Sequence, residues 1–231
     1  MLISVASHLT DDNRKNVEAV MSKYGVTTEA MVDYITGLLT SENIVQGRSW
    51  YREAYGFATG LAYGISVSTA AGVISALSPR MPWERNKDLA LKMVDAYYWN
   101  PDFTIGELVN KTGGALRTNL FQAAQILMTG DVDGYLTGIK RRSFYNSIVT
   151  AGQSDDVTVD VWMARVPMAV STQKGMDLDF SGAFLKARNH SGYVAVANAV
   201  RVVAANRGLS PATTQAASWI ALSGSINGSK G

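Results

Sequence analysis

Cysteine is absent from this chain of 231 residues, and histidine occurs only at His8 and His190. The lack of cysteine excludes disulfide bonds, thiol catalysis, zinc–thiolate sites and cysteine-ligated iron–sulfur clusters. Two isolated histidines argue against a histidine metal site or a Ser–His pair, and His190 is expected in a loop. The sequence therefore predicts neither a bound metal nor a cofactor.

Motifs for nucleotide phosphates and membranes are missing as well. The chain has no GxxxxGK run followed by Ser or Thr and no strand-linked GxGxxG, so no nucleotide cofactor is expected. Gly, Ser and Thr interrupt the most apolar stretch, residues 56–77, which excludes a membrane-spanning segment. No charged leader precedes a long apolar run at the N-terminus, so we expect a cytoplasmic protein. Four acids favour turn and cap roles over cation binding: Asp131, Asp133, Asp155 and Asp156.

The excess of positive charge is small, at a formal net charge of +2, but the basic residues cluster. Clusters occur in residues 80–87, 140–142 and 186–207. Such clusters suit a local nucleic-acid surface, or they are ordinary solvated faces of helices. The hydrophobic fraction of 47% allows a buried core in one domain or in two small lobes.

Apolar residues recur at helical spacing along most of the chain, and no β alternation or internal repeat persists. The fold is therefore predicted to be all-α. Thr27 or Thr28 is expected to cap a helix, and Trp50, Tyr51 and Phe57 pack between helices or form a stacking platform. Helices are expected over 13–24, 66–77, 84–99, 104–110, 116–128, 158–166, 193–206 and 211–222, with a loop at 175–179 and a flexible tail at 223–231.

The most informative segment runs from Gly138 to Asp160 and reads GIKRRSFYNSIVTAGQSDDVTVD. A glycine turn precedes the basic residues 140–142 and an apolar helical run. The segment ends in the lone acid Asp160 between two valines, with Arg165 five residues further on.

This segment resembles the helix-hairpin-helix (HhH-GPD) DNA glycosylase superfamily, whose usual pattern is GVGxKTA, a helix, and then VDxHxxR. The spacing from Gly138 to Asp160 (160 − 138 = 22) matches that pattern without a gap. The resemblance implies a two-lobed helical fold, with a core lobe at 70–167, the hairpin at about 131–150 and a second lobe from 1–69 and 168–222. It also implies an active site in the cleft between the lobes, double-stranded DNA as the partner and a monomeric enzyme.

The resemblance assigns the hairpin to the DNA backbone. Backbone N–H groups and a helix N-terminus grip a phosphate in such a hairpin. Lys140 stands where the superfamily usually has a second glycine, which points to a different turn or to a lysine that contacts phosphate itself. The expected phosphate-binding residues are Gly138, Ile139, Lys140, Arg141, Arg142 and Ser143.

The resemblance assigns catalysis to Asp160. A carboxylate near the anomeric carbon stabilises the oxocarbenium-like sugar that forms as a base leaves, or positions a water. Asp160 is also placed to cap the helical run that follows, and the two roles are compatible. Trp162 stands where relatives often carry histidine, so the pocket differs.

Arg142 occupies the position of the nucleophilic lysine of bifunctional glycosylases. A guanidinium stays protonated and cannot form a Schiff base, so the enzyme is expected to be monofunctional. Lys140 is the reserve candidate for a nucleophile.

Two upstream segments resemble parts of the superfamily that meet the distorted strand. Arg80, with Trp83 and Arg85 beside it, is expected where a side chain fills the hole left by a flipped base. Its alternative is a solvated arginine in a connection bounded by proline. Arg117 is expected near the flipped nucleotide.

Three functions follow from the resemblance. The first is a monofunctional DNA glycosylase that uses Asp160 on a damaged or modified base. The second is a transferase on the same scaffold that hypermodifies a base in phage DNA. The third is a non-catalytic hairpin module that binds DNA and keeps Asp160 as a helix cap. The segments GRSWYREA, AAGVISALSPRMPWERN and QAASWIAL are similar to small proteins common in bacteriophage genomes, which places the expected host in an infected bacterium.

Overall fold

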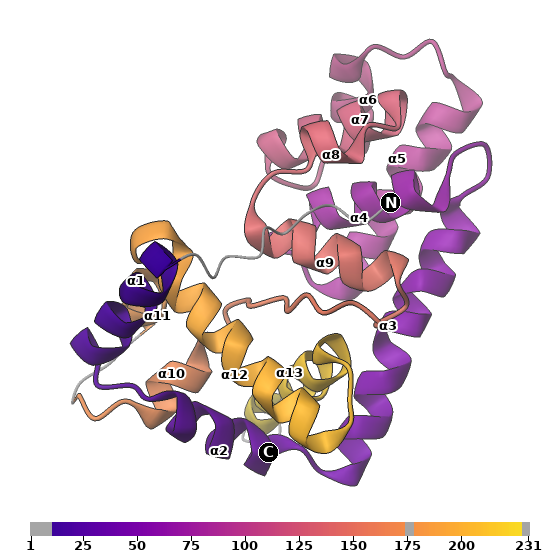
Figure 1. Cartoon of the computed structure of the whole chain (residues 1–231). Coiled ribbons are helices and arrows are strands. Elements are labelled where there is room, and N and C mark those ends of the chain that lie inside the picture. Colours follow the sequence, from indigo (N-terminus) through magenta and orange to yellow (C-terminus); the bar gives the residue numbers. More distant parts are fainter. Residues whose placement is uncertain (1–10, 174–177, 228–231) are drawn as a thin grey trace. The chain divides into compact units, whose positions relative to one another are not determined.

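The computed structural model describes residues 11–173 and 178–227, and every regular element within them is a helix (Figure 1). The predicted all-α class is confirmed. None of the described helices is both long enough and apolar enough to cross a membrane. The helices are α1 Asp11–Lys23, α2 Thr28–Leu38, α3 Ser41–Leu61, α4 Val67–Leu77, α5 Trp83–Trp99, α6 Ile105–Thr112, α7 Arg117–Thr129, α8 Val132–Tyr135, α9 Ile139–Val149, α10 Arg165–Val170, α11 Leu178–Leu185, the 3₁₀ turn η1 Arg188–His190, α12 Ser191–Arg207 and α13 Pro211–Asn227.

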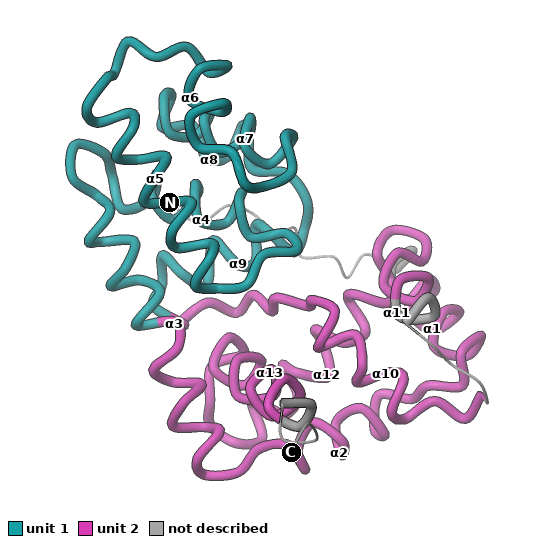
Figure 2. The backbone as a smooth tube through the Cα atoms, turned by 180° about the vertical axis from the view of Figure 1, so that it is seen from behind, with its two compact units in different colours: residues 1–4, 52–151 teal, residues 5–51, 152–231 magenta. Residues whose placement is uncertain are grey.

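The chain divides into two compact units, coloured separately in Figure 2. Among the described residues, unit 1 comprises 52–151, and unit 2 comprises 11–51, 152–173 and 178–227. The resemblance predicted lobe boundaries after residues 69 and 167. The units divide after residue 51, inside α3, and after residue 151, shortly after the end of α9.

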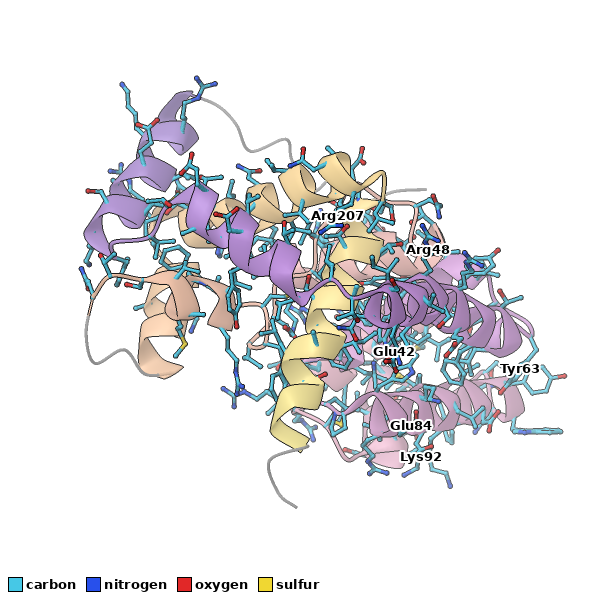
Figure 3. All side chains as sticks on the ribbon, turned by 90° about the horizontal axis from the view of Figure 1, so that it is seen from below. Glu42, Arg48, Tyr63, Glu84, Lys92 and Arg207 are labelled. Carbon is cyan, nitrogen blue, oxygen red and sulfur yellow. The ribbon has the colours of Figure 1, made fainter. Side chains whose placement is uncertain are left out.

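Helix α4 forms the centre of unit 1 and packs against α5, α7 and α9 (Figure 1). Residues 69–77 are all buried, because the run TAAGVISAL offers mainly small side chains that let neighbouring helices approach closely. A Cβ at Gly72 would come within 2.9 Å of Ile126 and 3.0 Å of Val132, so glycine is required where α7 and α8 meet α4. Lys92 on α5, labelled in Figure 3, joins α5 to the end of α6 by donating to the carbonyl of Thr112 at 2.7 Å.

Helix α12 plays the corresponding role in unit 2. It packs against α1, α2, α11 and α13, and most of its valines and alanines are buried. Gly192 lies against the backbone of Phe184, where a Cβ would overlap the carbonyl oxygen at 2.0 Å. The core of this unit therefore depends on small residues as well as on the periodic valines that predicted the helix.

Several predicted helix ends are confirmed. Thr27 is the N-cap of α2, since its hydroxyl accepts from the Ala30 amide at 3.1 Å. Gly130 and Gly208 end α7 and α12 in the left-handed conformation.

The prediction of a helix over 158–166 is wrong. Residues 156–160 have no regular structure, 161–164 form turns, and the helix α10 begins at Arg165. Pro167 does not interrupt this helix, because it lies in the first turn, where no intrahelical N–H bond is needed.

Two other expectations also differ from the structure. The loop predicted at 175–179 includes Leu178 and Asp179, which belong to α11, while 174–177 lie outside the described residues. Helix α13 continues to Asn227, five residues beyond the predicted end, so the tail predicted from 223 is helical to that point.

Candidate functional site

The segment predicted as a hairpin forms a short helix, a turn and a longer helix within unit 1. Gly138 is the N-cap of α9 and has a φ of 87°, a conformation that glycine adopts without strain. No side chain caps this end of α9, and its first turn has no acid. The first amides of α9 therefore retain the donors and the partial positive charge that favour an anion.

Arg142 braces the hairpin from inside. Its Nε donates to the Leu136 carbonyl at 2.8 Å, and its Nη2 donates to the Asp133 carbonyl at 3.0 Å. Its Nη1 also lies 3.3 Å from the Asp133 carboxylate. These bonds tie α9 back to α8, so Arg142 holds the turn in place.

Arg141 is committed to the same turn. Its guanidinium donates to the Gln122 side-chain oxygen and, at 2.9 Å, to the Thr137 hydroxyl. Burial lowers the pKa of this guanidinium from its ordinary value. Within the described part of the chain, Lys140 makes no hydrogen bond or ion pair, so it is the hairpin cation whose charge is uncommitted.

The other predicted hairpin residues differ in accessibility. Ile139 is half-buried as the first residue of α9, whereas Ser143 is buried and its carbonyl accepts from the Ser147 hydroxyl at 2.9 Å. The hairpin surface is thus formed by the backbone from Gly138 to Arg141 and the side chain of Lys140.

Arg80 lies in a strained turn before α5. The Met81 amide donates to the Ser78 carbonyl at 3.2 Å, and Arg80 has a φ of 60°, which costs a non-glycine residue about 1 kcal/mol. Its side chain is exposed and makes no hydrogen bond, ion pair or ring contact with other described residues, so both roles, wedge and solvated arginine, stay predictions.

Trp83 and Arg117, both expected to contact DNA, are engaged in contacts within unit 1. The Trp83 ring packs edge-on against Phe57 and Phe144, with centroids 6.1 Å and 6.4 Å away, and Lys87 lies over its face. It is therefore a packing residue of unit 1. Arg117 lies over the Phe121 ring at 5.3 Å and donates to Asn110 at 3.5 Å.

Asp160 follows a buried irregular segment in unit 2. Val157 and Val159 are almost fully buried, and one side chain fixes the backbone of both. The Tyr193 hydroxyl donates to the Val157 carbonyl at 2.6 Å and accepts from the Val159 amide at 3.2 Å. This tertiary contact holds the segment outside any helix, where local periodicity predicted one.

The Asp160 carboxylate accepts three N–H bonds. Oδ1 accepts from the amides of Trp162 at 2.9 Å and Met163 at 3.1 Å, while Oδ2 accepts from the Trp219 indole N–H at 3.0 Å. Asp160 therefore caps the turn 161–164 and not a helix, because the N-cap of α10 is Ala164, which has no side-chain capping bond. The residue is half-buried.

The Tyr51 hydroxyl links α3 to α13 and to the segment that precedes Asp160. The Tyr51 hydroxyl donates to the Gln215 side-chain oxygen at 2.8 Å and lies 3.4 Å from the Thr158 hydroxyl. Gln215 and Trp219 lie one turn apart on α13 and so share a face.

The segments GRSWY (47–51), VTVDVW (157–162) and QAASW (215–219) therefore converge within unit 2. Sequence reasoning noted all three but did not connect them, because their separations along the chain carry no periodic signal. Their shared content of aromatic and polar residues was the available hint.

Metal binding finds no support in the described residues, which hold no group of three or more His, Asp or Glu side chains suited to a cation. Asp131 caps α8 through the Gly134 amide at 2.9 Å, as the turn prediction required. Asp156 lies in a local turn with the Ser154 hydroxyl at 3.2 Å.

The structure brings the predicted residues together in two groups. The hairpin residues, Arg80, Trp83 and Arg117 belong to unit 1, whereas Asp160 and its braces belong to unit 2. The model of a family of unknown function, DUF7178, matches residues 17–226. No curated protein sequence and no solved structure shows a significant match to the chain.

Proposed function

The chain belongs to the DUF7178 family, and because the function of that family is unknown we propose one from the site itself. We propose that the protein is a monofunctional DNA glycosylase-like enzyme. It binds double-stranded DNA through the hairpin and uses Asp160 to hydrolyse the N-glycosidic bond of a flipped damaged or modified base.

The uncapped N-terminus of α9 is the observation that carries this proposal. It presents backbone N–H donors after Gly138, and Lys140 adds a positive charge that no described residue neutralises. Backbone donors and a positive charge at a helix N-terminus together bind a phosphate. The braces from Arg141 and Arg142 keep the turn rigid before any ligand arrives, which reduces the entropy lost on binding.

The arrangement around Asp160 supports the chemical step. Departure of a base leaves positive charge on the sugar, and an oriented carboxylate stabilises that charge without reorganising. Three N–H donors give Asp160 this fixed orientation, and its partial exposure leaves room for a sugar.

The absence of lyase activity follows from Arg142. Its guanidinium is committed to Leu136 and Asp133, so it offers no neutral amine for attack on the sugar. The product is then an intact strand with an abasic site.

A second candidate is a non-catalytic DNA-binding module. The bonds of Asp160 to the turn 161–164 favour it, because these bonds alone would explain an aspartate at this position. The two candidates share the hairpin and differ only in whether a base is released.

The test compares the wild-type chain with Asp160→Asn on a panel of duplexes that carry damaged or modified bases. Abasic sites are revealed by cleavage in hot alkali, and binding is followed by fluorescence anisotropy. We expect release by the wild type alone, with DNA binding kept by both proteins. Binding without release from any duplex would argue against the glycosylase. Nucleoside mass spectrometry would then distinguish a transferase, which alters a base, from the binding module, which does not.

A further inference from the structure

We propose that Trp219 is a positioning residue for Asp160: its indole N–H fixes the carboxylate so that Oδ2 faces the reacting sugar. This inference deepens the proposed function and rests on it, because it needs Asp160 to act on a sugar. It follows from the hydrogen bonds of the carboxylate itself.

The two oxygens of Asp160 differ in what they still have to offer. Each carboxylate oxygen has two acceptor positions. On Oδ1 both are taken, by the amides of Trp162 and Met163. On Oδ2 the described residues take only one, through the Trp219 indole at 3.0 Å. A water or a cationic sugar therefore has its free acceptor position on Oδ2.

The bond from Trp219 determines which way that position points. The two amide bonds hold Oδ1 but leave the carboxylate plane able to tilt about it. The third donor comes from a different element, α13, and removes this freedom. An oriented donor of this kind supplies electrostatic preorganisation that a cap alone does not provide.

Trp219 is itself held firmly. Its ring lies 6.1 Å from that of Trp50, and Trp50 packs edge-on against Tyr51 at 4.8 Å. Tyr51 in turn bonds Gln215, one helical turn before Trp219. This shell of α3 and α13 side chains holds the indole that bonds the carboxylate, so its effect on the carboxylate passes through the indole.

The competing explanation is purely structural, in which the indole bond only joins α13 to the segment 157–163. Both explanations predict that Trp219→Phe loses stability, because it removes a hydrogen bond to a charged group. They differ in whether the variant loses its preference for a positively charged sugar over a neutral one.

The experiment uses two duplexes that are identical except for one nucleotide without a base. One carries a pyrrolidine ring, which is cationic at neutral pH and resembles the transition state, and the other carries neutral tetrahydrofuran. The ratio of their dissociation constants is measured by fluorescence anisotropy with the full chain. Partial unfolding lowers the concentration of active protein equally for both duplexes, so it cancels in this ratio.

We expect the wild type to prefer the pyrrolidine duplex and Asp160→Asn to lose that preference. Trp219→Phe should reduce the preference by about tenfold, while tetrahydrofuran binding stays unchanged. Tyr51→Phe is the matched control. Like Trp219→Phe it removes a hydrogen-bond donor of the shell, here the buried Tyr51 hydroxyl, but it leaves the indole bond in place. Its ratio should equal that of the wild type.

Each other outcome has a clear meaning. If Trp219→Phe keeps the full preference that Asp160→Asn loses, the proposed function stands and the role of Trp219 is overturned. If the wild type shows no preference, the sugar-facing role of Asp160 fails, and this inference fails with it.

A second measurement tests the bond without DNA. The indole N–H resonance of Trp219, assigned by its loss in Trp219→Phe, should shift and exchange faster with solvent in Asp160→Asn. A resonance that is unaffected by Asp160→Asn would show that the bond does not form, which overturns the inference whatever the activity.

Discussion

Gly47 on α3 lies directly against Ala217 on α13. A Cβ at position 47 would come within 2.7 Å of the Ala217 amide nitrogen and 2.9 Å of the Thr213 carbonyl oxygen. Such a contact is closer than a real Cβ adopts, so only glycine allows the two backbones to meet there. The next turn of α3 carries Trp50 and Tyr51, which pack against Trp219 and Gln215. The glycine thus sets the distance at which the shell behind Asp160 forms.

Gly47→Ala should therefore destabilise the protein. The added methyl group meets backbone atoms that cannot rotate away, and overpacking of this kind costs about 1–3 kcal/mol. The free energy of unfolding measured by urea denaturation tests this expectation.

Gly56→Ala provides the control on the same helix. Nothing lies within 4 Å of a Cβ at position 56, so the change should stabilise the protein by about 0.5–1 kcal/mol through helix propensity. A loss of stability equal to that of Gly47→Ala would contradict the close contact with α13.

Lys140 and Arg142 should have separable effects. Lys140→Ala removes a charge that has no partner among the described residues, so stability should hold while DNA affinity falls. The slope of log affinity against log salt should decrease by about 0.9 if one phosphate contact is lost. Fluorescence anisotropy at several salt concentrations measures both quantities.

Arg142→Lys should behave in the opposite way. The charge remains, but the bonds to Leu136 and Asp133 are lost, so stability should fall by about 1–3 kcal/mol. A variant as stable as the wild type would mean that the brace does not hold the hairpin in solution.

Borohydride should trap no covalent complex between the wild-type protein and substrate DNA, because Schiff-base chemistry needs a neutral amine. Arg142→Lys should also fail to produce one, since position 142 is directed at the Leu136 carbonyl inside the hairpin. A trapped adduct in the wild type that disappears in Lys140→Ala would instead identify Lys140 as the nucleophile.

Tyr63 should ionise at unusually high pH. Burial, together with a hydrogen bond to the Asp95 carboxylate, raises the pKa of Tyr63 from 10.0 to about 12. The folded protein therefore holds this proton up to about pH 12, whereas the unfolded chain releases it near pH 10.0. The stabilisation is present in full below pH 10.0 and is lost as the pH rises towards 12.

Tyr63→Phe should remove this part of the pH dependence. The difference between the unfolding free energies of wild type and variant should shrink across that interval, and the tyrosinate absorbance should lose a component near pH 12. Tyr98→Phe serves as the control, because Tyr98 packs edge-on against Tyr63 but is half exposed. An identical absorbance titration in Tyr63→Phe and wild type would contradict the assignment.

Local sequence patterns were sufficient for most of the secondary structure. The caps at Thr27 and Gly130 and the periodic valines of α12 act within a few residues, so the sequence displays them directly. The same locality explains the prediction of a turn at Gly138 and a cap at Asp160, since both depend on residues within three positions.

The sequence alone thus determined that the chain is helical and that Gly138 begins a helix after a turn. It predicted a helix over 158–166, and only the tertiary structure decided that residues 157–160 are not helical, because the Tyr193 hydroxyl bonds their backbone from a distant helix. It also decided that Arg142 is a brace and that Trp219 contacts Asp160. The physical reason is that these bonds join residues of different elements, and such pairings depend on how helices pack and have no periodicity that a sequence could reveal.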